Sequence, residues 1–233
     1  MPTNNKGKRA VNKSVSMLAV VLPVALAAGL GYAVLSLPEQ ASGLADVVAN
    51  HMDNSGVSHP VTAVLLNFRG YDTFLELVVL LTALLGVWSL APLASQPQTV
   101  PAGPVLMALS RFLMPVMILV AGYLLWAGAH APGGAFQAGS VLAAAGVLML
   151  LCGHQLSPRL AGWPLRLGLM LGTVVFMAAG LAVMFGGTQF LQYPVSWAGG
   201  LILLIELAAT LSIGFTLAAL FAGNRPAAGE NRL

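Results

Sequence analysis

The sequence has very little charge. Only 7% of its 233 residues are charged, whereas a typical soluble chain has about 25%. Uncharged intervals are correspondingly long: 25 residues separate Lys13 from Glu39, 34 separate Glu76 from Arg111, and 47 separate Arg111 from Arg159. A soluble globular domain of ordinary composition is therefore excluded.

Cysteine and the motifs of soluble enzymes are also scarce. The single cysteine, Cys152, excludes an internal disulfide and a cysteine-based metal cluster. The histidines have no metal-ligand spacing, and no glycine-rich phosphate loop, nucleophile elbow or cofactor fingerprint is present. We therefore expect a chain that is not an independent enzyme and that needs no metal and no cofactor.

Long apolar runs are what the sequence has instead. Hydrophobic residues make up 58% of the chain, and a transmembrane helix needs about 20 apolar residues to cross about 30 Å of hydrocarbon. The runs are continuous rather than alternating, which favours helices over barrel strands. They predict an all-α, polytopic membrane protein with about six transmembrane helices, near residues 16–37, 70–92, 106–129, 136–153, 164–186 and 197–222.

The ten basic residues predict the orientation of these helices. With six crossings, nine of them fall on one side, and only Arg69 falls on the other. The positive-inside rule then places both termini in the cytoplasm of a cell whose membrane the chain spans. The net charge of +3 reflects this topology and not nucleic-acid binding. A cleaved signal peptide is the alternative for the N-terminus, but its apolar stretch of about twenty residues is longer than usual.

The chain divides into two blocks. Residues 1–95 hold two predicted helices joined by a long polar segment on the outer side, and residues 106–233 hold four helices with short connections. Residues 96–105, rich in proline, form a cytoplasmic linker without apolar periodicity. Such a linker is typical of a joint between two formerly separate units.

Glu206 is the strongest candidate for a functional residue. It stands about nine residues into the last predicted helix, close to the middle of the membrane. An ionised side chain there costs roughly 2.5–3.5 kcal/mol on insertion scales. We therefore expect Glu206 to be protonated, or to face a cation or a water-filled cavity. Ion or proton handling is the functional hypothesis, and a structural hydrogen bond to a neighbouring helix is the alternative.

Three charged residues, Arg69, Asp72 and Glu76, open the second predicted helix. Their spacing puts them on one helical face, descending about 10 Å from the outer interface. Asp72 is expected to pair with Arg69, and Glu76 lies one turn deeper without an obvious cation. Together with Glu206 they suggest an ion path from the outer surface. The alternative is that carboxylates at a helix N-terminus simply favour its dipole.

The segment "WAGAHAPGGAFQAGS" forms the outer turn between the third and fourth predicted helices. Pro132, Gly133 and Gly134 predict a tight chain reversal. His130 and Gln137 are the polar side chains of the turn that could orient a proton or water, and they are candidate relay groups. The alternative for His130 is an ordinary interface histidine without such a role.

Small residues continue beyond this turn. Ala135, Gly139 and Ala143 recur every fourth position. Such a row lets a second helix approach closely. We therefore expect a packed helix pair here.

Two of these motifs resemble a known family. "FRGYDTFLELVV" resembles the "FRGFDTxGE" helix in the C-terminal part of the largest Mrp antiporter protein, a module that also occurs as a small subunit of membrane-bound, gas-evolving hydrogenases. "GAHAPGGAFQAGS" resembles the "GHxxPGGGFQGG" turn of the MnhB family, the four-helix proteins of Mrp (Mnh) antiporters. The chain departs from these patterns at Ala135 and Ala138, which replace glycines, at Asn67, which replaces an acid, and at Leu75, which replaces a glycine.

The resemblance implies a subunit of a multi-subunit sodium (monovalent cation)/proton antiporter. Its partners would be large proton-channel subunits, small membrane subunits and the lipid bilayer, and its ions a monovalent cation and protons. Asp72, Glu76 and Glu206 would then lie near a sodium route. The alternatives are the membrane arm of a hydrogenase or related redox complex, and a purely structural spacer.

Overall fold

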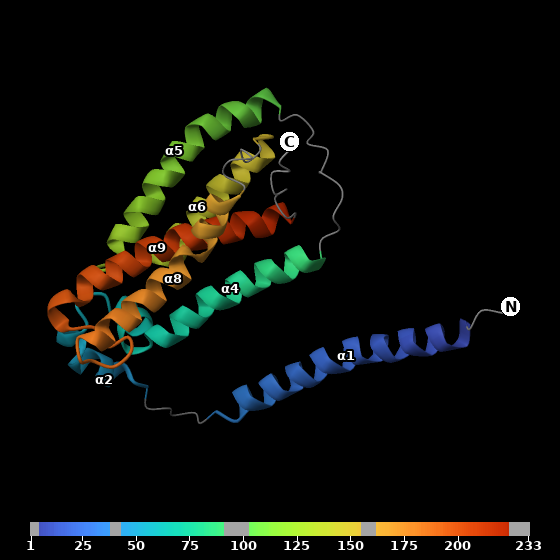
Figure 1. The fold of residues 1–233 in the computed structure, drawn as a ribbon, viewed down its shortest axis with the longest axis horizontal. Helices are drawn as coiled ribbons and strands as arrows, with labels where there is room; N and C mark the ends of the chain where they lie inside the picture. Colours follow the sequence, from blue (N-terminus) through green and yellow to red (C-terminus); the bar gives the residue numbers. More distant parts are fainter. Residues whose placement is uncertain (1–4, 38–42, 91–102, 155–161, 224–233) are drawn as a thin grey trace. The chain divides into compact units, whose positions relative to one another are not determined.

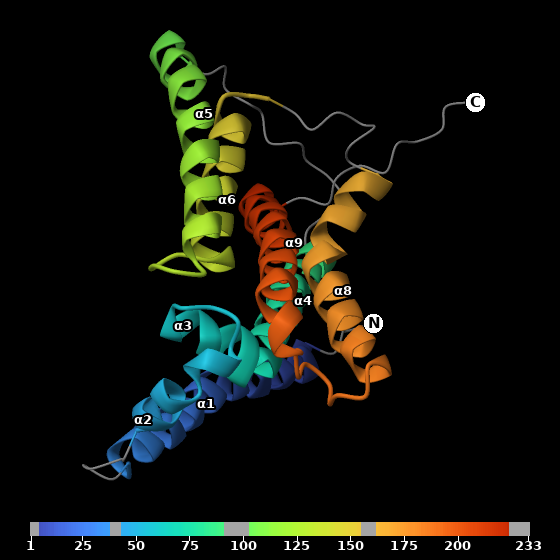
Figure 2. The same cartoon turned by 90° about the vertical axis from the view of Figure 1, so that its left-hand side faces the viewer.

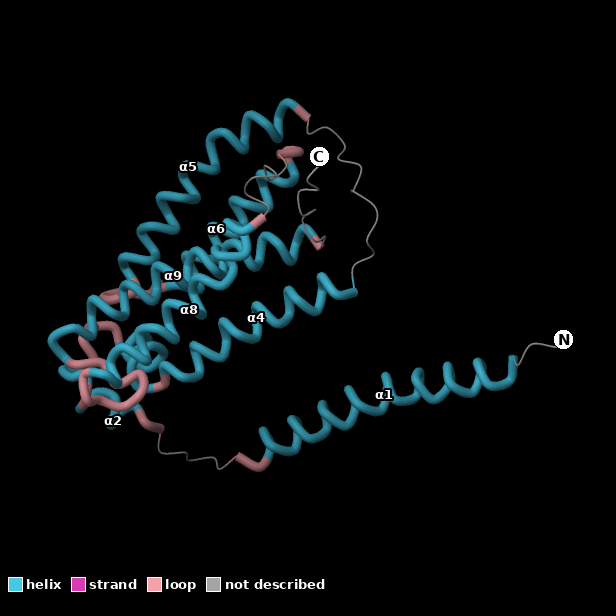
Figure 3. The backbone as a smooth tube through the Cα atoms, viewed as in Figure 1, coloured by secondary structure: helices cyan, strands magenta, loops and turns pink. Residues whose placement is uncertain are grey.

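The computed structural model describes residues 5–37, 43–90, 103–154 and 162–223, and within these ranges it describes the side chains of residue 17 and of residues 20 onward. Within these ranges every regular element is helical, and Figure 3 shows cyan helices joined by pink loops without a magenta strand. The predicted all-α class is therefore confirmed. Most of the predicted linker at residues 96–105 lies outside the described residues.

Six long helices correspond to the six predicted ones (Figure 1). They are α1 (Asn5–Leu35), α4 (Gly70–Leu90), α5 (Pro104–Ala127), α6 (Ala135–Leu151), α8 (Trp163–Phe185) and α9 (Val195–Ala222). Of these, α4, α5, α8 and α9 are long and apolar enough to cross a membrane, while α6 and the Val20–Leu35 part of α1 are shorter apolar helices. The polytopic membrane fold is thus as expected, and the orientation of the termini stays a prediction.

The chain forms two compact units, Met1–Ala45 and Asp46–Leu233. The first consists mainly of α1, a helix of 31 residues with Pro23 inside it. The second contains α4 together with the four helices of the C-terminal half. The candidate functional residues all lie in this second unit.

Helix α9 is the centre of the second unit. It packs against α4, α5, α6 and α8, and Figure 2 shows it between α6 and α8. Its buried residues Ile202, Ile205, Ala209 and Ile213 share one core cluster with Phe176 of α8, which is fully buried. Because lipid is as apolar as these side chains, close packing rather than burial from water holds such helices together.

Glycines make the contact between α6 and α9 close. A Cβ added at Gly139 would lie 2.8 Å from Cγ2 of Ile213, and one added at Gly146 would lie 3.1 Å from Cβ of Ala218. Ala143 is 5% exposed on the same helix. The predicted row of small residues is confirmed as a packing surface, and its partner is α9.

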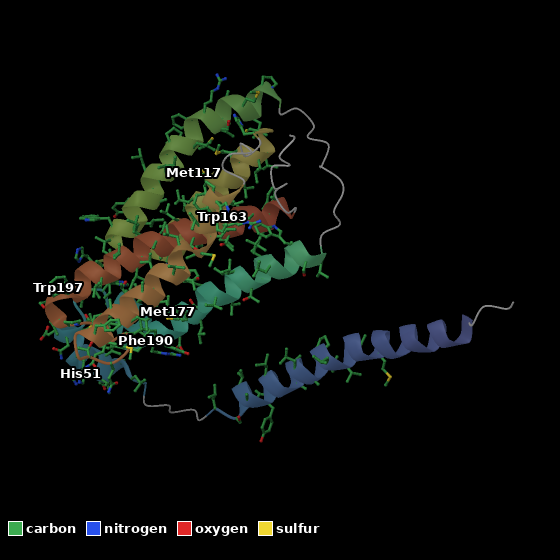
Figure 4. All side chains as sticks on the ribbon, in the orientation of Figure 1. His51, Met117, Trp163, Met177, Phe190 and Trp197 are labelled. Atoms are coloured by element: carbon green, nitrogen blue, oxygen red, sulfur yellow. The ribbon has the colours of Figure 1, made fainter. Side chains whose placement is uncertain are left out.

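Several helix boundaries follow from local sequence. Pro104 begins α5, where the missing N–H costs no hydrogen bond. Gly223 ends α9 with a left-handed backbone, φ 64°. Trp163 begins α8, and Trp197 lies near the start of α9; both are exposed and are labelled in Figure 4. Because α8 and α9 run antiparallel, with Gly172 against Ala209 and Gly168 against Phe215, the two indoles mark opposite ends of this helix pair. Tryptophan at both ends is typical of a helix bundle in a bilayer.

The segment before α4 is more ordered than the sequence predicted. The expected polar connection contains the short helix α2 (Ala45–Asn50), the 3₁₀ turn η1 (Met52–Asn54), the short helix α3 (Pro60–Ala63) and the π-helical turn η2 (Val64–Phe68). Pro60 at the first helical position fits the start of α3. This segment packs on the first turns of α9, because a Cβ at Gly56 would lie 2.8 Å from the backbone nitrogen of Gly199.

Candidate functional site

Glu206 is buried inside the second unit. Its side chain is 2% exposed, and it lies eleven residues after Val195, or about 16 Å along the axis of α9. Ile205 and Ala209 beside it on α9 are 0% and 3% exposed. Glu206 therefore lies well inside a helix that is long enough to cross a membrane, and its depth in the bilayer stays a prediction.

The carboxylate of Glu206 contacts the turn between α5 and α6, residues 128–134. The backbone N–H of Ala135 donates a hydrogen bond to it. A Cβ added at Gly134 would lie 2.8 Å from Glu206 Oε1, and one added at Gly128 would lie 3.3 Å from the same oxygen. Helix α6 therefore begins level with Glu206, and the turn lies inside the bundle. Glu206 and the proline–glycine turn, which the sequence offered as two separate candidates, therefore meet at one place. Neither motif predicts this contact by itself.

Glycine is required in this turn. Gly134 has a backbone φ of 104°, a conformation that residues other than glycine rarely adopt. Its N–H donates a hydrogen bond to the carbonyl of Leu124 at 2.8 Å. A Cβ at Gly133 would collide with that same carbonyl oxygen. The reversal predicted from Pro132, Gly133 and Gly134 is thus present. Its glycines also leave room for the Glu206 carboxylate, which a side chain at Gly134 would contact.

The contact supports the structural alternative for Glu206 as well. The first N–H groups of a helix have no partner within that helix, and the helix dipole favours negative charge there. Gly134, which precedes α6, has no side chain to supply a cap. Glu206 takes this role from another helix and so connects α9 to the start of α6.

The second oxygen of Glu206 has a different environment. Oε2 is buried and has no hydrogen-bond partner among the described residues. One turn further along α9, the Thr210 hydroxyl donates to the carbonyl of Ala135 at 3.5 Å and is directed there. Because a buried polar atom without a partner costs free energy, Oε2 is the atom at which a proton, a cation or a water would bind.

Residues 58–62 cover the turn from outside the four-helix half. The N–H groups of Ser58 and His59 donate to the carbonyl of Ala129, both at 3.0 Å. The Thr62 hydroxyl donates to the carbonyl of Gly128 at 2.5 Å. Figure 2 shows α3 close beneath this turn. Irregular backbone at membrane depth is tolerated where protein buries it, and here residues 58–62 provide that cover.

His130 and Gln137 lie at the edge of the site. His130 is exposed, its ring stands edge-on to Trp126 at 6.2 Å, and its Nδ1 lies 3.1 Å from the Ser58 hydroxyl. Gln137 is exposed on α6, and its Oε1 would lie 3.8 Å from a Cβ at Gly134. A relay role for either residue stays a prediction.

Arg69, Asp72 and Glu76 lie elsewhere. The Arg69 guanidinium contacts the Asp72 carboxylate, so the expected ion pair is present, with the side chains 67% and 48% exposed. Glu76 is exposed as well. At about 100° per residue, Glu76 points about 60° away from Thr73, about 100° away from Leu77 and about 160° away from Phe74, three of the buried residues of α4. Arg69, Asp72 and Glu76 form an exposed charged row, in which Glu76 lies at the flank of the buried face of α4 and not opposite to it.

Glu76 lies close to the level of Glu206 along the bundle. The ring of Phe74 packs on Phe176 of α8, with centroids 5.7 Å apart. In the antiparallel α8–α9 pair, Gly172 lies against Ala209, so Phe176, one turn further on, is level with Glu206. Glu76 and Glu206 consequently lie at similar depth on different sides of the bundle. The structure does not bring these two carboxylates together.

Sequence reasoning missed the residues that cover the turn. Ser58, His59 and Thr62 precede an apolar run, and the sequence alone assigns them to a polar connection. Three small polar or ionisable residues immediately before a membrane segment were the available signal. Among the described residues, no group of three His, Cys, Asp or Glu side chains lies together as a metal site.

A helix bundle with a carboxylate buried at membrane depth against an inserted turn defines a polytopic membrane protein with an intramembrane ionisable site. A family model described as "Domain related to MnhB subunit of Na+/H+ antiporter" matches residues 105–223. A second model, MbhE, which describes the E subunit of MBH, matches residues 9–96. The chain belongs to the family of MnhB-related domains, and it carries an MbhE-like module before that domain.

Two solved structures have the same fold. A chain of the membrane-bound sulfane sulfur reductase, an archaeal respiratory membrane complex, is 22% identical with a TM-score of 0.68, over 89% of this chain and 97% of that chain. A chain of the Mrp complex from Dietzia sp. DQ12-45-1b is 22% identical with a TM-score of 0.62, over 99% of this chain and 27% of that chain. Among curated proteins, no sequence matches.

Proposed function

We propose that this chain is a transport subunit of a multi-subunit sodium (monovalent cation)/proton antiporter in the cell membrane, and that Glu206 is its ion- or proton-binding group. The observation that carries the proposal is the buried Glu206 carboxylate, whose Oε2 has no partner among the described residues. Membership of the MnhB-related family supports it. The subunit supplies no catalytic chemistry of its own.

The geometry suits a small hard ion. One N–H holds the carboxylate in place, and the other oxygen stays available to a proton or to a cation such as Na⁺, both of which bind carboxylate oxygen well. The nearby carbonyl of Gly128 and hydroxyl of Thr62 are further oxygen groups at the same level. Glycine at positions 128 and 134 leaves room for the carboxylate to approach the backbone.

The charged row on α4 supports a place in a larger complex. An exposed carboxylate inside a membrane helix is costly unless protein or a wet cavity covers it. Asp72 has Arg69 as its partner, whereas Glu76 has no ion pair among the described residues. We propose that large proton-channel subunits and small membrane subunits of the complex cover this face.

A second candidate function is the membrane arm of a respiratory redox complex. It is favoured by the fold match to nearly the full length of a chain from the sulfane sulfur reductase complex, and by the match of residues 9–96 to the MbhE model. In that setting Glu206 would conduct ions while partner subunits carry out the electron transfer. Affinity purification in mild detergent separates the two: copurifying iron–sulfur or nickel–iron subunits indicate a redox complex, and large antiporter subunits without them indicate an antiporter.

The substitution Glu206→Gln tests the proposed role. Glutamine keeps the size and an oxygen that can accept the Ala135 N–H, but it neither carries a charge nor binds a proton. We expect the assembled complex to lose cation-dependent proton exchange by about tenfold or more. The measurement is proton flux in inverted membrane vesicles after addition of Na⁺, with the amount of assembled complex determined in the same vesicles.

Glu206→Leu is the matched control for the capping role. Leucine removes the acceptor of the Ala135 N–H, so this variant is expected to reduce assembly as well as exchange. If Glu206→Gln assembles and exchanges ions at the normal rate, Glu206 only caps α6, and the chain is a structural spacer.

A further inference from the structure

We propose that ions reach Glu206 along the seam between residues 58–62 and residues 128–130, and not along the charged face of α4. The seam is the hydrogen-bonded contact between the segment that covers the turn and the turn itself. This inference rests on the proposed function, because it describes the access route to the same carboxylate.

Polar groups follow one another along the seam. At its exposed end, the Ser58 hydroxyl lies 3.1 Å from His130 Nδ1 and 3.2 Å from the carbonyl of Ala129. At its buried end, Thr62 is 5% exposed, and its hydroxyl donates to the carbonyl of Gly128. Hydroxyl and imidazole groups both donate and accept hydrogen bonds, so they can pass a proton or replace the hydration shell of a cation.

The buried end of the seam reaches Glu206. Gly128 accepts the Thr62 hydroxyl and also lies beside Glu206 Oε1. Two buried polar atoms here have no hydrogen-bond partner among the described residues, Nδ1 of His59 and Oε2 of Glu206. Buried polar atoms of this kind are where proteins bind internal water. The seam is therefore suited to carry water-borne ions.

The other sides of Glu206 are less suitable. Ile202, Ile205 and Phe176 are 0–1% exposed and entirely apolar. Gln137 is the polar side chain near Gly134 on the α6 side, and it forms the competing route. The seam offers several polar groups in succession and an exposed end, whereas the α6 side offers Gln137 and the buried Thr210, whose hydroxyl is directed to the carbonyl of Ala135, so the observations favour the seam.

Cysteine accessibility tests the route without relying on transport. Thr62→Cys is made in a Cys152→Ala background, and membranes containing the whole complex are treated with a small, positively charged methanethiosulfonate reagent added in water. Ala209→Cys is the matched control, because Ala209 is 3% exposed and Thr62 is 5% exposed, but Ala209 lies in the apolar core. We expect modification of the Thr62→Cys variant to be at least about tenfold faster, since thiol reactivity requires access of water and reagent.

A functional arm accompanies the labelling. Thr62→Val removes the hydroxyl and is expected to slow cation-dependent exchange about fivefold, the effect of one lost hydrogen bond. Thr62→Ser restores the hydroxyl and is expected to restore the rate. Recovery with serine distinguishes a role of the hydroxyl from a general loss of packing.

The outcomes separate this inference from the proposed function. Equal, slow modification of both cysteine variants while Glu206→Gln abolishes exchange would leave the function intact and overturn the seam. An effect of Gln137→Leu on exchange without any effect of Thr62→Val would place the route on the α6 side and also overturn it. Fast modification at position 62 with normal exchange by Glu206→Gln would support a hydrated seam and refute the proposed function.

Discussion

Asn67 occupies a position where the antiporter motif that this chain resembles has an acid. Its amide Nδ2 donates to the carbonyl of Ser55 at 2.8 Å. Ser55 is fully buried, and its hydroxyl lies 2.7 and 2.8 Å from the carbonyls of Met52 and Val57. An ionised carboxylate has no donor for such a contact. The amide is therefore explained by its role in fixing the segment that leads to residues 58–62.

We predict that Asn67→Asp destabilises the protein more than Asn67→Ala does. Aspartate places a carboxylate oxygen against the Ser55 carbonyl, whereas alanine only removes the donor. The expected loss for the aspartate variant is about 1–3 kcal/mol, the cost of an unsatisfied buried polar group. Thermal unfolding of the purified complex in detergent measures it. Equal midpoints for aspartate and alanine would show that the donated hydrogen bond does not decide the residue at this position.

At the scale of elements, the α5–α6 turn determines where α6 begins. Its backbone is held by the carbonyl of Leu124, by Thr62 and by Glu206, each from a different element. Because α6 has only 17 residues, or about 25 Å at 1.5 Å per residue, it is shorter than the hydrocarbon layer. The turn therefore lies at a depth where its glycines must accommodate neighbouring side chains as well as the chain reversal.

A series of glycine-to-alanine variants separates these two requirements. Gly122→Ala, in α5 with nothing within 4 Å of its Cβ, is expected to be neutral or slightly stabilising. Gly153→Ala has φ 81° but open space, so it should cost about 1 kcal/mol of backbone strain. Gly134→Ala has both φ 104° and a contact at 2.8 Å from Glu206 Oε1, and it should cost more than either.

The readout for this series is the amount of folded complex that survives graded heating in detergent. The expected order of stability is Gly122→Ala first, Gly153→Ala second and Gly134→Ala last. A Gly134→Ala variant as stable as Gly153→Ala would mean that Glu206 does not press against the turn.

Sequence reasoning accounted for some of these features and not for others. It identified the six long helices because each apolar run has a length fixed by the bilayer, and it identified the Arg69–Asp72 pair because i, i+3 neighbours are local. The meeting of Glu206 with Gly134 depends on the offset between α6 and α9, a tertiary quantity that no local pattern contains. The sequence also did not show whether Glu76 lies on the buried or the exposed face of α4, because the lipid-facing and core-facing surfaces of a membrane helix are equally apolar.

At the scale of the whole molecule, the distribution of basic residues leads to a topology prediction. Arg166 lies in the first turn of α8, stacked on Trp163 at 5.9 Å, and this end of the bundle is opposite to the α5–α6 turn. Arg111 lies seven residues inside α5. We expect the end that carries these residues to face the cytoplasm.

Cysteine labelling of intact cells checks this orientation. In the Cys152→Ala background, Asn54→Cys and His154→Cys place single thiols at exposed positions near opposite ends of the bundle. A membrane-impermeant maleimide is expected to modify the Asn54→Cys variant in intact cells, and to modify the His154→Cys variant only after the membrane is opened. The reverse pattern would invert the topology and the direction from which ions reach Glu206.

The cover of the turn has a consequence for how the protein is made. Residues 58–62 precede the turn in the chain, so they leave the ribosome before residues 128–134 do, and chains generally fold from the N-terminus as they are synthesised. When α5 and α6 arrive in the membrane, the segment that satisfies the Gly128 and Ala129 carbonyls is already tethered beside them. In a protein that carries both modules on one chain, insertion of the turn thus does not have to wait for an encounter between two separately synthesised subunits.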